Sequence, residues 1–298
     1  MRPLLMLWIF WVGCIMLSPD GVASDRVGYP NAQFLIETQK LAARLGNEPE
    51  LRILDARDPE IYREGHLDGA VNLPAATTDY LEANRQGFPI PTAWAQRLLR
   101  ATGINASSRV VIYDEQGNTL AARIFYFLEF FGHSHVQILN GGLKKWRMEG
   151  RPITADAPRV PDGDFIPVPN PTLVATSEWI LKHLPPQVVI IDARSPAEYR
   201  GERAIGPRGG HIPGAVNIPW DRVLGPGNDQ IFLPAGSLRQ VFAESHIAPA
   251  RQVVVYCQFG TRGAEIYFAL RLMGYRQVRL YDGGWEDWSA DTKLPVEK

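Results

Sequence analysis

The chain contains the same sequence unit twice, and this repeat limits the folds that it can adopt. The segment 65–74, Gly-His-Leu-Asp-Gly-Ala-Val-Asn-Leu-Pro, returns at 210–219 as Gly-His-Ile-Pro-Gly-Ala-Val-Asn-Ile-Pro. Three shorter segments return in the same order: 53–57 at 190–194, 110–114 at 253–257, and 140–146 at 282–288. The period of roughly 140 residues is the size of a domain, whereas the units of a solenoid span about 20–50 residues. We therefore predict two copies of one domain.

The length of 298 residues suits two domains joined by a connector. The stretch 156–171 contains five prolines, and proline interrupts both helices and sheet ladders. We expect the first domain at 24–155 and the second at 172–298. Between them, 156–171 should form an extended, semi-rigid connector that runs over the surface.

Within each copy, short β-branched runs alternate with helical patterns. The segments 188–191 and 278–280 have the composition of buried strands, and 263–272 has the pattern of a helix. This alternation predicts an α/β fold, in which each domain is a mostly parallel sheet flanked by helices. Sites in such sheets form at the carboxyl ends of the strands. We expect Trp146, Trp285 and Trp288 to fill the cores.

The composition argues against several classes of partner. The formal net charge is −1 and no basic run occurs, so we expect no binding to nucleic acid. The hydrophobic content of 45% and the charged content of 21% are ordinary for a globular protein with two cores. We expect no cofactor and no metal ion.

Residues 1–23 have the pattern of a secretory signal peptide. Arg2 supplies a positive charge, residues 4–17 are apolar, and Gly21-Val22-Ala23 offers small residues for cleavage after Ala23. The apolar stretch is short for a spanning helix, which needs about 20 residues. We expect a periplasmic or secreted protein. The alternative is a chain anchored to the membrane by an uncleaved leader.

Cleavage after Ala23 would remove Cys14 and leave Cys257 as the only cysteine. A single cysteine cannot form an internal disulfide. In an oxidising compartment, a lone thiol is a liability unless it has a use. This argument favours chemistry at Cys257.

The local sequence also places Cys257 where a nucleophile belongs. It follows the Val-rich run 253–256, which predicts a buried strand, and a helical pattern begins a few residues later. The backbone N–H groups of the intervening loop can converge on the sulfur, and Arg262 adds a positive charge. We therefore expect a thiol of lowered pKa. A buried structural cysteine is the alternative.

These features are similar to the tandem-domain rhodanese family of sulfurtransferases. The resemblance covers nearly all of the chain after the leader. It is carried by the Asp-Ala-Arg strand end, the Gly-His-Ile-Pro-Gly-Ala-Val-Asn segment, the cysteine loop and the Asp-Gly-Gly-Trp turn. It implies that the second domain is catalytic and that the first is an inactive copy, because Asp114 stands at the position of Cys257.

The resemblance further implies sulfur transfer in two steps. The Cys257 thiolate takes the outer sulfur of a small anionic donor, and the persulfide then passes it to cyanide or a thiol. The predicted site consists of two catalytic residues, Cys257 and Arg262, and six substrate-binding residues: Gln258, Phe259, Gly260, Thr261, Arg194 and Arg200. Arg194 recurs as Arg57 in the inactive copy, so a scaffold role for it stays open. His66 and His211 occupy equivalent positions in the two copies, which argues against a purely catalytic role.

The residues after Cys257 bear on which sulfur donor the protein uses. Related thiosulfate enzymes often carry basic residues there, and mercaptopyruvate enzymes carry small ones. Gln258 and Phe259 fit neither pattern. Because the small residues are missing, we expect thiosulfate to be the better donor and 3-mercaptopyruvate the second choice. Phe259 also suggests a surface for an acceptor such as a protein thiol.

Two other functions fit part of this pattern. A cysteine phosphatase related to this fold needs five residues between its cysteine and arginine, whereas four separate Cys257 from Arg262. The smaller loop suits sulfur better than phosphate. A redox sensor or a sulfur-carrier partner in a periplasmic pathway is also consistent with an exposed, reactive thiol.

The loop of the first copy has a different chemistry. Asp114 cannot hold a transferable sulfur, and the following residues 115–119 contain no arginine that matches Arg262. Glu115 adds a second acidic group, which should repel anionic donors. We expect the first domain to be a structural partner that shapes one wall of the catalytic cleft.

Overall fold

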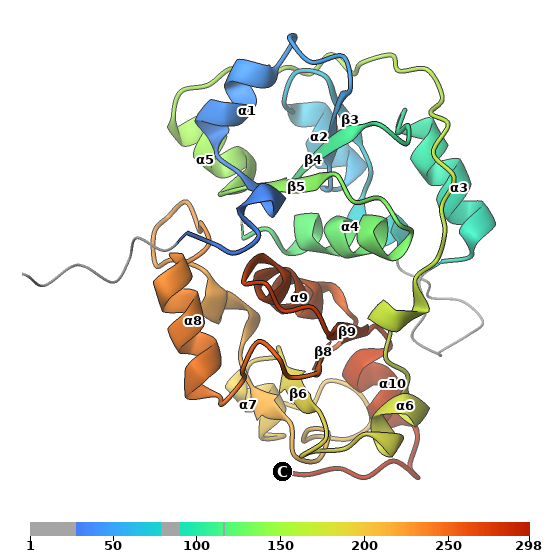
Figure 1. The fold of residues 1–298 in the computed structure, drawn as a ribbon, viewed down its shortest axis with the longest axis vertical. Helices are drawn as coiled ribbons and strands as arrows, with labels where there is room; N and C mark the ends of the chain where they lie inside the picture. The colour runs from blue at the N-terminus through green and yellow to red at the C-terminus, as the bar shows by residue number, and fades with distance from the viewer. Residues whose placement is uncertain (1–27, 79–89, 116) are drawn as a thin grey trace, which may run out of the picture.

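The computed structural model describes residues 28–78, 90–115 and 117–298, and this part of the chain forms two parallel sheets with helices around them (Figure 1). The first sheet has the strand order β1-β5-β4-β2-β3 and the second has the order β7-β6-β8-β9. The strands are β1 (Leu35–Ile36), β2 (Leu51–Asp55), β3 (Ala70–Asn72), β4 (Arg109–Tyr113), β5 (Val136–Leu139), β6 (Val189–Asp192), β7 (Val216–Asn217), β8 (Val253–Tyr256) and β9 (Val278–Tyr281). The α/β prediction is confirmed.

Helices follow the strands in both halves. They are α1 (Thr38–Arg44), α2 (Pro59–Glu64), α3 (Thr92–Ala101), α4 (Thr119–Phe130), α5 (Gly142–Met148), α6 (Ser177–Lys182), α7 (Pro196–Tyr199), α8 (Ala235–Glu244), α9 (Thr261–Leu272) and α10 (Gly284–Ala290). Short 3-10 helices are η1 (Ala32–Phe34), η2 (Ala75–Thr78), η3 (Pro171–Leu173) and η4 (Trp220–Val223). Trp146, Trp285 and Trp288 are buried, as predicted.

The central strand of the second sheet is hydrophobic along its whole length. All four residues of β8 are buried, because β6 and β9 flank it and helices cover both faces. The parallel register pairs Tyr256 with Asp192 on one side and with Tyr281 on the other. The residues that follow these three therefore meet at one edge of the sheet, with Cys257 between the other two.

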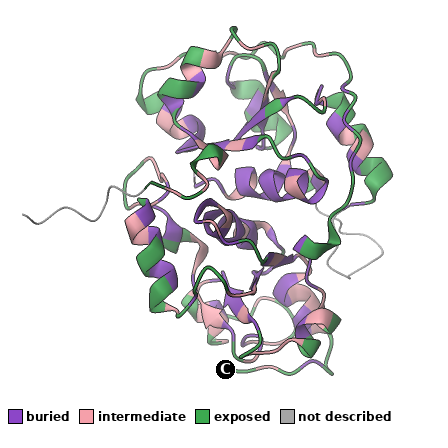
Figure 2. Cartoon of the chain, viewed as in Figure 1, coloured by how far each residue is buried: buried purple, intermediate pink, exposed green. Residues whose placement is uncertain are grey.

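The two domains meet through α4 and α9, the helices that follow their central strands (Figure 1). Nine of the twelve residues in each helix are buried, as the purple helices at the centre of Figure 2 show. Helices that are apolar on most sides are stable only when other elements cover them. Phe125 packs on Phe268 and Tyr126 packs on Tyr267, with ring centroids 4.8 and 5.1 Å apart. This reciprocal pairing gives the interface an approximate twofold symmetry.

The connector between the domains is extended, and it also forms hydrogen bonds and core contacts with the first domain. Gly163 N–H donates to the carbonyl of Arg100, and Phe165 N–H donates to the carbonyl of Ile104. The Phe165 side chain is buried and belongs to the large core. The middle of the connector is therefore fastened along the first domain, which the proline content alone did not reveal.

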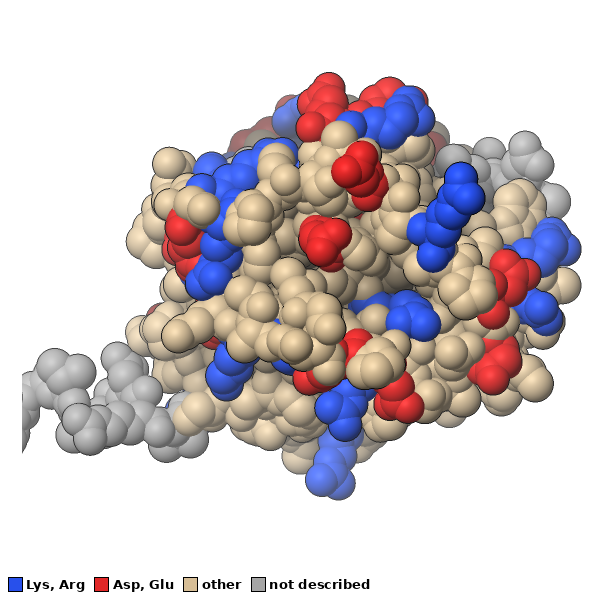
Figure 3. Space-filling model, turned by 90° about the horizontal axis from the view of Figure 1, so that it is seen from above, with Lys and Arg blue, Asp and Glu red and all other residues tan. Residues whose placement is uncertain are grey.

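The predicted leader, residues 1–23, lies outside the described residues. The segment that follows it reaches the second domain, since Asn31 donates to the carbonyls of Leu272 and Arg271. No helix in the described ranges is long and apolar enough to cross a bilayer. On the face of the molecule seen in Figure 3, residues of both charge signs are interspersed.

Candidate active site

The sulfur of Cys257 lies in a ring of backbone amides at the carboxyl end of β8. The N–H groups of Phe259, Arg262 and Gly263 donate to it, and the last two belong to the first turn of α9. This is the predicted convergence of loop amides on the sulfur. The side chain is 1% exposed, and Cys257 packs in the core that spans both domains.

Two glycines allow the loop to take this shape. Gly260 has φ +84°, a value that side chains rarely adopt, and a Cβ there would lie 2.1 Å from an oxygen of Asp282. A Cβ on Gly284 would lie 2.5 Å from the carbonyl oxygen of Cys257. The start of α10 therefore packs directly against the loop, and Trp285 N–H donates to the Cys257 carbonyl at 2.7 Å.

The expected lowering of the Cys257 pKa was wrong. Complete burial is the largest effect and raises the pKa of the thiol above its ordinary value. The charge of Arg262 and the amides of Gly263, Phe259 and Arg262 act in the opposite direction but do not outweigh burial. The sequence showed the amides and the arginine, but it could not show that the sulfur is shielded from water.

Arg262 is engaged by a carboxylate that the sequence analysis did not identify. Its Nη1 and Nη2 donate to the two oxygens of Glu198 at 2.9 and 2.8 Å. Burial by itself would raise the pKa of Glu198, but hydrogen bonds from Arg262 and Ser195 lower it to about 2. Glu198 therefore carries a charge that compensates Arg262.

A sequence signal for Glu198 did exist. The Ser195-Pro-Ala-Glu198 segment is a capping box at the start of α7, with Ser195 and Glu198 hydrogen-bonded reciprocally. That pattern accounts for the helix start. Only the folded chain places the same carboxylate against Arg262.

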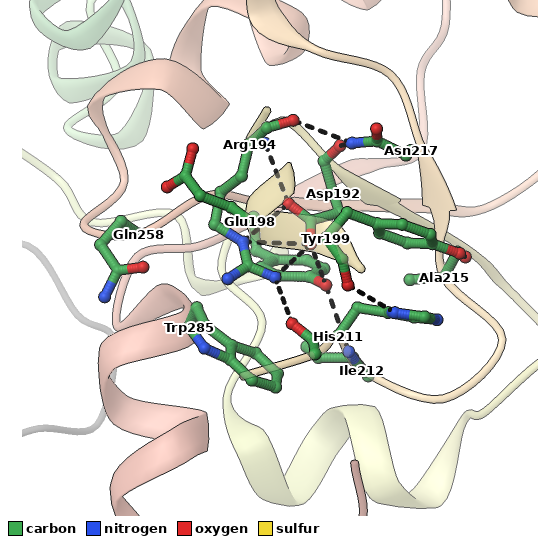
Figure 4. Close-up of polar contacts among 12 residues, drawn as sticks. Asp192, Arg194, Glu198, Tyr199, His211, Ile212, Ala215, Asn217, Gln258 and Trp285 are labelled. Carbon is green, nitrogen blue, oxygen red and sulfur yellow. Dashed lines mark hydrogen bonds and ion pairs between the residues drawn. The ribbon is translucent and has the colours of Figure 1, made fainter. Parts of the chain in front are cut away.

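Arg194 is mainly part of the scaffold. It binds Asp192 through Nε and Nη2, donates to the carbonyl of Gly210 and stacks on Trp285 at 4.5 Å (Figure 4). Arg57 makes the same contacts to Asp55 and Gly65 in the first domain.

The two arginines differ at one nitrogen. In the first domain, Nη1 of Arg57 is bound to Glu115, the residue after Asp114, at 2.9 Å. No described residue is hydrogen-bonded to the same nitrogen of Arg194. The residue after Cys257 is Gln258, whose side chain donates to Ile205 and Glu286 instead. One donor of Arg194 is therefore uncommitted beside the catalytic loop.

Among the other predicted ligands, Phe259 reaches the sulfur through its backbone N–H, whereas the side chains of Arg200 and Gln258 are bound to other residues. Arg200 is exposed and paired with Glu202. Gln258 donates to the carbonyl of Ile205 and to Glu286, so it connects the segment between α7 and β7 to the catalytic loop. Phe259 is 52% exposed, whereas Gly260 and Thr261 form the turn into α9.

The histidines hold the scaffold in both domains. His211 stacks on Tyr199 at 3.7 Å and its Nδ1 lies 2.9 Å from the Tyr199 carbonyl oxygen. His66 stacks on Tyr62 at 3.9 Å with the same hydrogen bond. The shared geometry fits the structural role that their equivalent positions in the two copies indicated.

In the first domain, a carboxylate fills the place of the sulfur. Asp114 accepts hydrogen bonds from the N–H groups of Asn118, Leu120 and Ala121, and Leu120 stands where Arg262 does in the second copy. The contacts of Glu115 give no support to the expectation that it repels anionic donors. Glu115 is paired with both Arg57 and Arg147, so its charge is compensated.

Comparisons with known proteins agree with this geometry. The rhodanese-like domain family matches residues 37–149 and 176–291. The sulfur carrier protein TtuD of Thermus thermophilus is 33% identical over 91% of this chain and 99% of its own length. A thiosulfate sulfurtransferase of Corynebacterium glutamicum is 34% identical over 90% of this chain and 92% of its own length.

Solved structures show the same fold. The crystal structure of YnjE is 24% identical and superposes with a TM-score of 0.82 over 91% of this chain and 69% of that one. An anaerobic ergothioneine biosynthesis enzyme from Chlorobium limicola is 25% identical, with a TM-score of 0.78 over 91% of this chain and 71% of that one. The chain therefore belongs to the rhodanese family of sulfurtransferases, with two rhodanese-like domains in tandem.

Proposed function

We propose that the protein transfers sulfane sulfur from thiosulfate to a thiophilic acceptor through a persulfide on Cys257. The thiolate attacks the outer sulfur of thiosulfate, an S–S bond forms, and sulfite leaves with the electron pair of the broken bond. Cyanide or a thiolate then attacks the terminal sulfur of the Cys257 persulfide and releases the Cys257 thiolate. The products are thiocyanate or a new persulfide.

The observation that carries this proposal is the ring of amides around the Cys257 sulfur. The N–H groups of Phe259, Arg262 and Gly263 are fixed before reaction, so they can stabilise negative charge on the sulfur without reorganisation. Arg262 holds a positive charge against the same loop. The proposed substrate-binding residues are the loop 258–261 and the uncommitted donor of Arg194, whereas the pairing of Arg200 with Glu202 gives it less support.

The choice of thiosulfate over 3-mercaptopyruvate has two supports. Relatives from Corynebacterium glutamicum and Azotobacter vinelandii carry the name thiosulfate sulfurtransferase, at 34% and 31% identity. The residues after Cys257 also lack the small side chains of the mercaptopyruvate type. Competition between the two donors should give the higher kcat/KM for thiosulfate.

The direct test is intact-mass analysis of the protein after incubation with thiosulfate alone. We expect a gain of about 32 Da, one sulfur atom per chain, which cyanide removes as thiocyanate. The near-isosteric variant Cys257→Ser should show neither the gain in mass nor turnover, while its circular dichroism matches that of the wild type. Turnover by that variant, with contaminating enzyme excluded, would refute the mechanism.

A second candidate function is that of a sulfur carrier, which hands its persulfide to another protein. It is favoured by the relation to the Thermus thermophilus carrier and by the exposed Phe259 ring next to the catalytic cysteine. A carrier should accept one sulfur per chain and turn over slowly with cyanide. Rapid multiple turnover with small acceptors would instead favour the enzyme.

The proposal includes export to the periplasm or the medium, supported by the pattern of residues 1–23. The purified mature protein should begin at Ser24. A chain that begins at Met1 in the membrane fraction would favour the anchored alternative. A full-length chain in the cytoplasmic fraction would contradict export.

A further inference from the structure

Arg123 comes from the first domain but lies under the catalytic loop of the second. It projects from α4, and its Nη1 and Nη2 bind the two carboxylate oxygens of Asp282, with the Nη2 contact at 2.9 Å. Nε and Nη2 also donate to the hydroxyl and carbonyl of Thr78. The side chains of Arg123 and Asp282 are 1% and 8% exposed. This is a bidentate ion pair buried between the domains, a geometry that resists displacement.

The ion pair touches the loop at Gly260. A Cβ built on Gly260 would lie 2.1 Å from Oδ1 of Asp282 and 3.2 Å from Nη1 of Arg123. Gly260 precedes α9, between the amide of Phe259 and those of Arg262 and Gly263. A shift of Gly260 would therefore move donors on both sides of the Cys257 sulfur.

The approximate twofold symmetry provides an internal comparison. Asn140 stands at the position of Asp282, and Glu265 stands at the position of Arg123. Asn140 accepts a hydrogen bond from Phe232 N–H of the second domain at 3.0 Å. The Glu265 carboxyl is fully buried, with no hydrogen-bond partner among the described residues. The ion pair thus lies under the loop that carries the cysteine, and the corresponding place near Asp114 holds neutral or unpartnered groups.

A second ion pair at the interface serves as a contrast. Glu129 of α4 binds Arg271 of α9, and these two residues occupy equivalent positions in the two copies. The Glu129–Arg271 pair is therefore related in the same way to the loop that carries Cys257 and to the loop that carries Asp114. Arg271 lies about 15 Å further along α9 than Thr261 at the helix start. The Glu129–Arg271 pair and the aromatic contacts therefore join the two domains at a distance from Cys257.

We propose that Arg123 is a positioning residue for the catalytic loop, acting through Asp282 and Gly260. The first domain, which has no nucleophile of its own, would then complete the active site of the second. This inference rests on the proposed function in one respect, namely that Cys257 carries the transferred sulfur. The geometric part, that Arg123 sets the environment of the Cys257 thiol, can be tested without any sulfur donor.

The test removes both charges together, so that no lone charge remains buried. In Arg123→Gln with Asp282→Asn, the second change introduces the residue type that the first copy has at position 140. We expect persulfide formation from thiosulfate to slow by about tenfold or more, because small displacements of aligned groups are costly. The thiol pKa, measured by alkylation with iodoacetamide at a series of pH values, should rise above that of the wild type. Arg123→Lys, which keeps the charge but loses the two-pronged contact, should lie between the two.

The matched control is Glu129→Gln with Arg271→Gln, which removes the other ion pair of the same interface. It should lower the thermal midpoint but leave the thiol pKa and the rate of persulfide formation unchanged. If the Arg123 variants leave both quantities unchanged, or if the control moves them equally, the inference is wrong and Arg123 only joins the domains. If the double variant at 123 and 282 fails to fold, Arg123→Lys and the single variant Asp282→Asn decide the question by the same readouts.

The two ideas can fail separately. If the wild type accepts no sulfur from thiosulfate, the proposed function fails, whereas iodoacetamide alkylation still reports whether Arg123 controls the thiol. If the wild type forms the persulfide and the Arg123 variants alkylate like the wild type, the proposed function stands and the inference about Arg123 fails.

Discussion

At Cys257, burial and hydrogen bonding act on the thiol in opposite directions. Burial raises the pKa of the sulfur, while Arg262 and the loop amides lower it without restoring the ordinary value. The Glu198 carboxylate binds the Arg262 guanidinium and compensates its charge. The site is thus a nearly neutral pair beside a buried thiol, rather than an isolated cation beside a thiolate.

Removing Glu198 should therefore activate the thiol. In Glu198→Gln, the charge of Arg262 is no longer compensated, so the pKa of Cys257 should fall below that of the wild type. In Arg262→Gln, the pKa should rise. The measurement is the rate of iodoacetamide alkylation against pH, which in the wild type should keep rising above the ordinary midpoint of a thiol. A higher pKa in Glu198→Gln would show that Arg262 does not act on the sulfur through its charge.

At the scale of elements, the two loops differ in length as well as in charge. Four positions lead from Cys257 to Thr261 at the start of α9, whereas five lead from Asp114 to Thr119 at the start of α4. In the first domain, the helix amides are satisfied by the Asp114 carboxylate itself. The amides at the start of α4 are therefore already occupied by a side chain of the first domain.

Asp114→Cys should not create a second active site. The longer loop would still carry Leu120 in place of Arg262, so a thiol there would lack the cation. After saturation with thiosulfate, mass analysis should count one persulfide per chain. A second stable persulfide, or turnover by Asp114→Cys in a Cys257→Ser background, would show that the first loop is competent.

At the scale of the whole molecule, the domains share one core. The largest hydrophobic cluster runs from Leu54 of β2 to Leu280 of β9 and includes α4, α9 and Cys257. Glu265 lies in this shared region, and burial followed by the nearby Asp114 raises its pKa well above the ordinary value. Burial likewise raises the pKa of Asp114, to about 7, although three backbone amides oppose the shift. Two carboxyl groups whose pKa is raised by burial therefore lie close to each other in this region.

Glu265→Gln should make the protein more stable, increasingly so at higher pH. The folded chain keeps the proton on Glu265 to higher pH, whereas the unfolded chain releases it above a pH of about 4.5, so the wild type loses stability as pH rises from there toward the raised pKa of the folded state. The advantage of the variant should grow by about 1.4 kcal/mol per pH unit in that window. Urea unfolding of both proteins at several pH values measures it. A difference that does not change with pH would contradict a protonated Glu265.

Much of this protein could be predicted from the sequence because the repeat and the hydrophobic patterns are local. The parallel sheets, the cysteine at the end of β8 and the amides that surround it follow from a Val-rich run, a Gly-containing loop and a helix in succession. The recurrence of Arg194 as Arg57 indicated a scaffold role, which its contacts with Asp192 support. The degenerate loop was identifiable from Asp114 alone.

The remaining features depend on residues that are far apart in the chain. Glu198 meets Arg262, Gln258 meets Ile205, and Arg123 reaches Asp282 only after both domains have folded and docked. The sequence by itself determined the fold and the position of the sulfur, because strand, loop and helix preferences act over a few residues. Only the tertiary structure decided the charge balance and the thiol pKa, because both depend on which distant groups exclude water and which carboxylate each arginine meets.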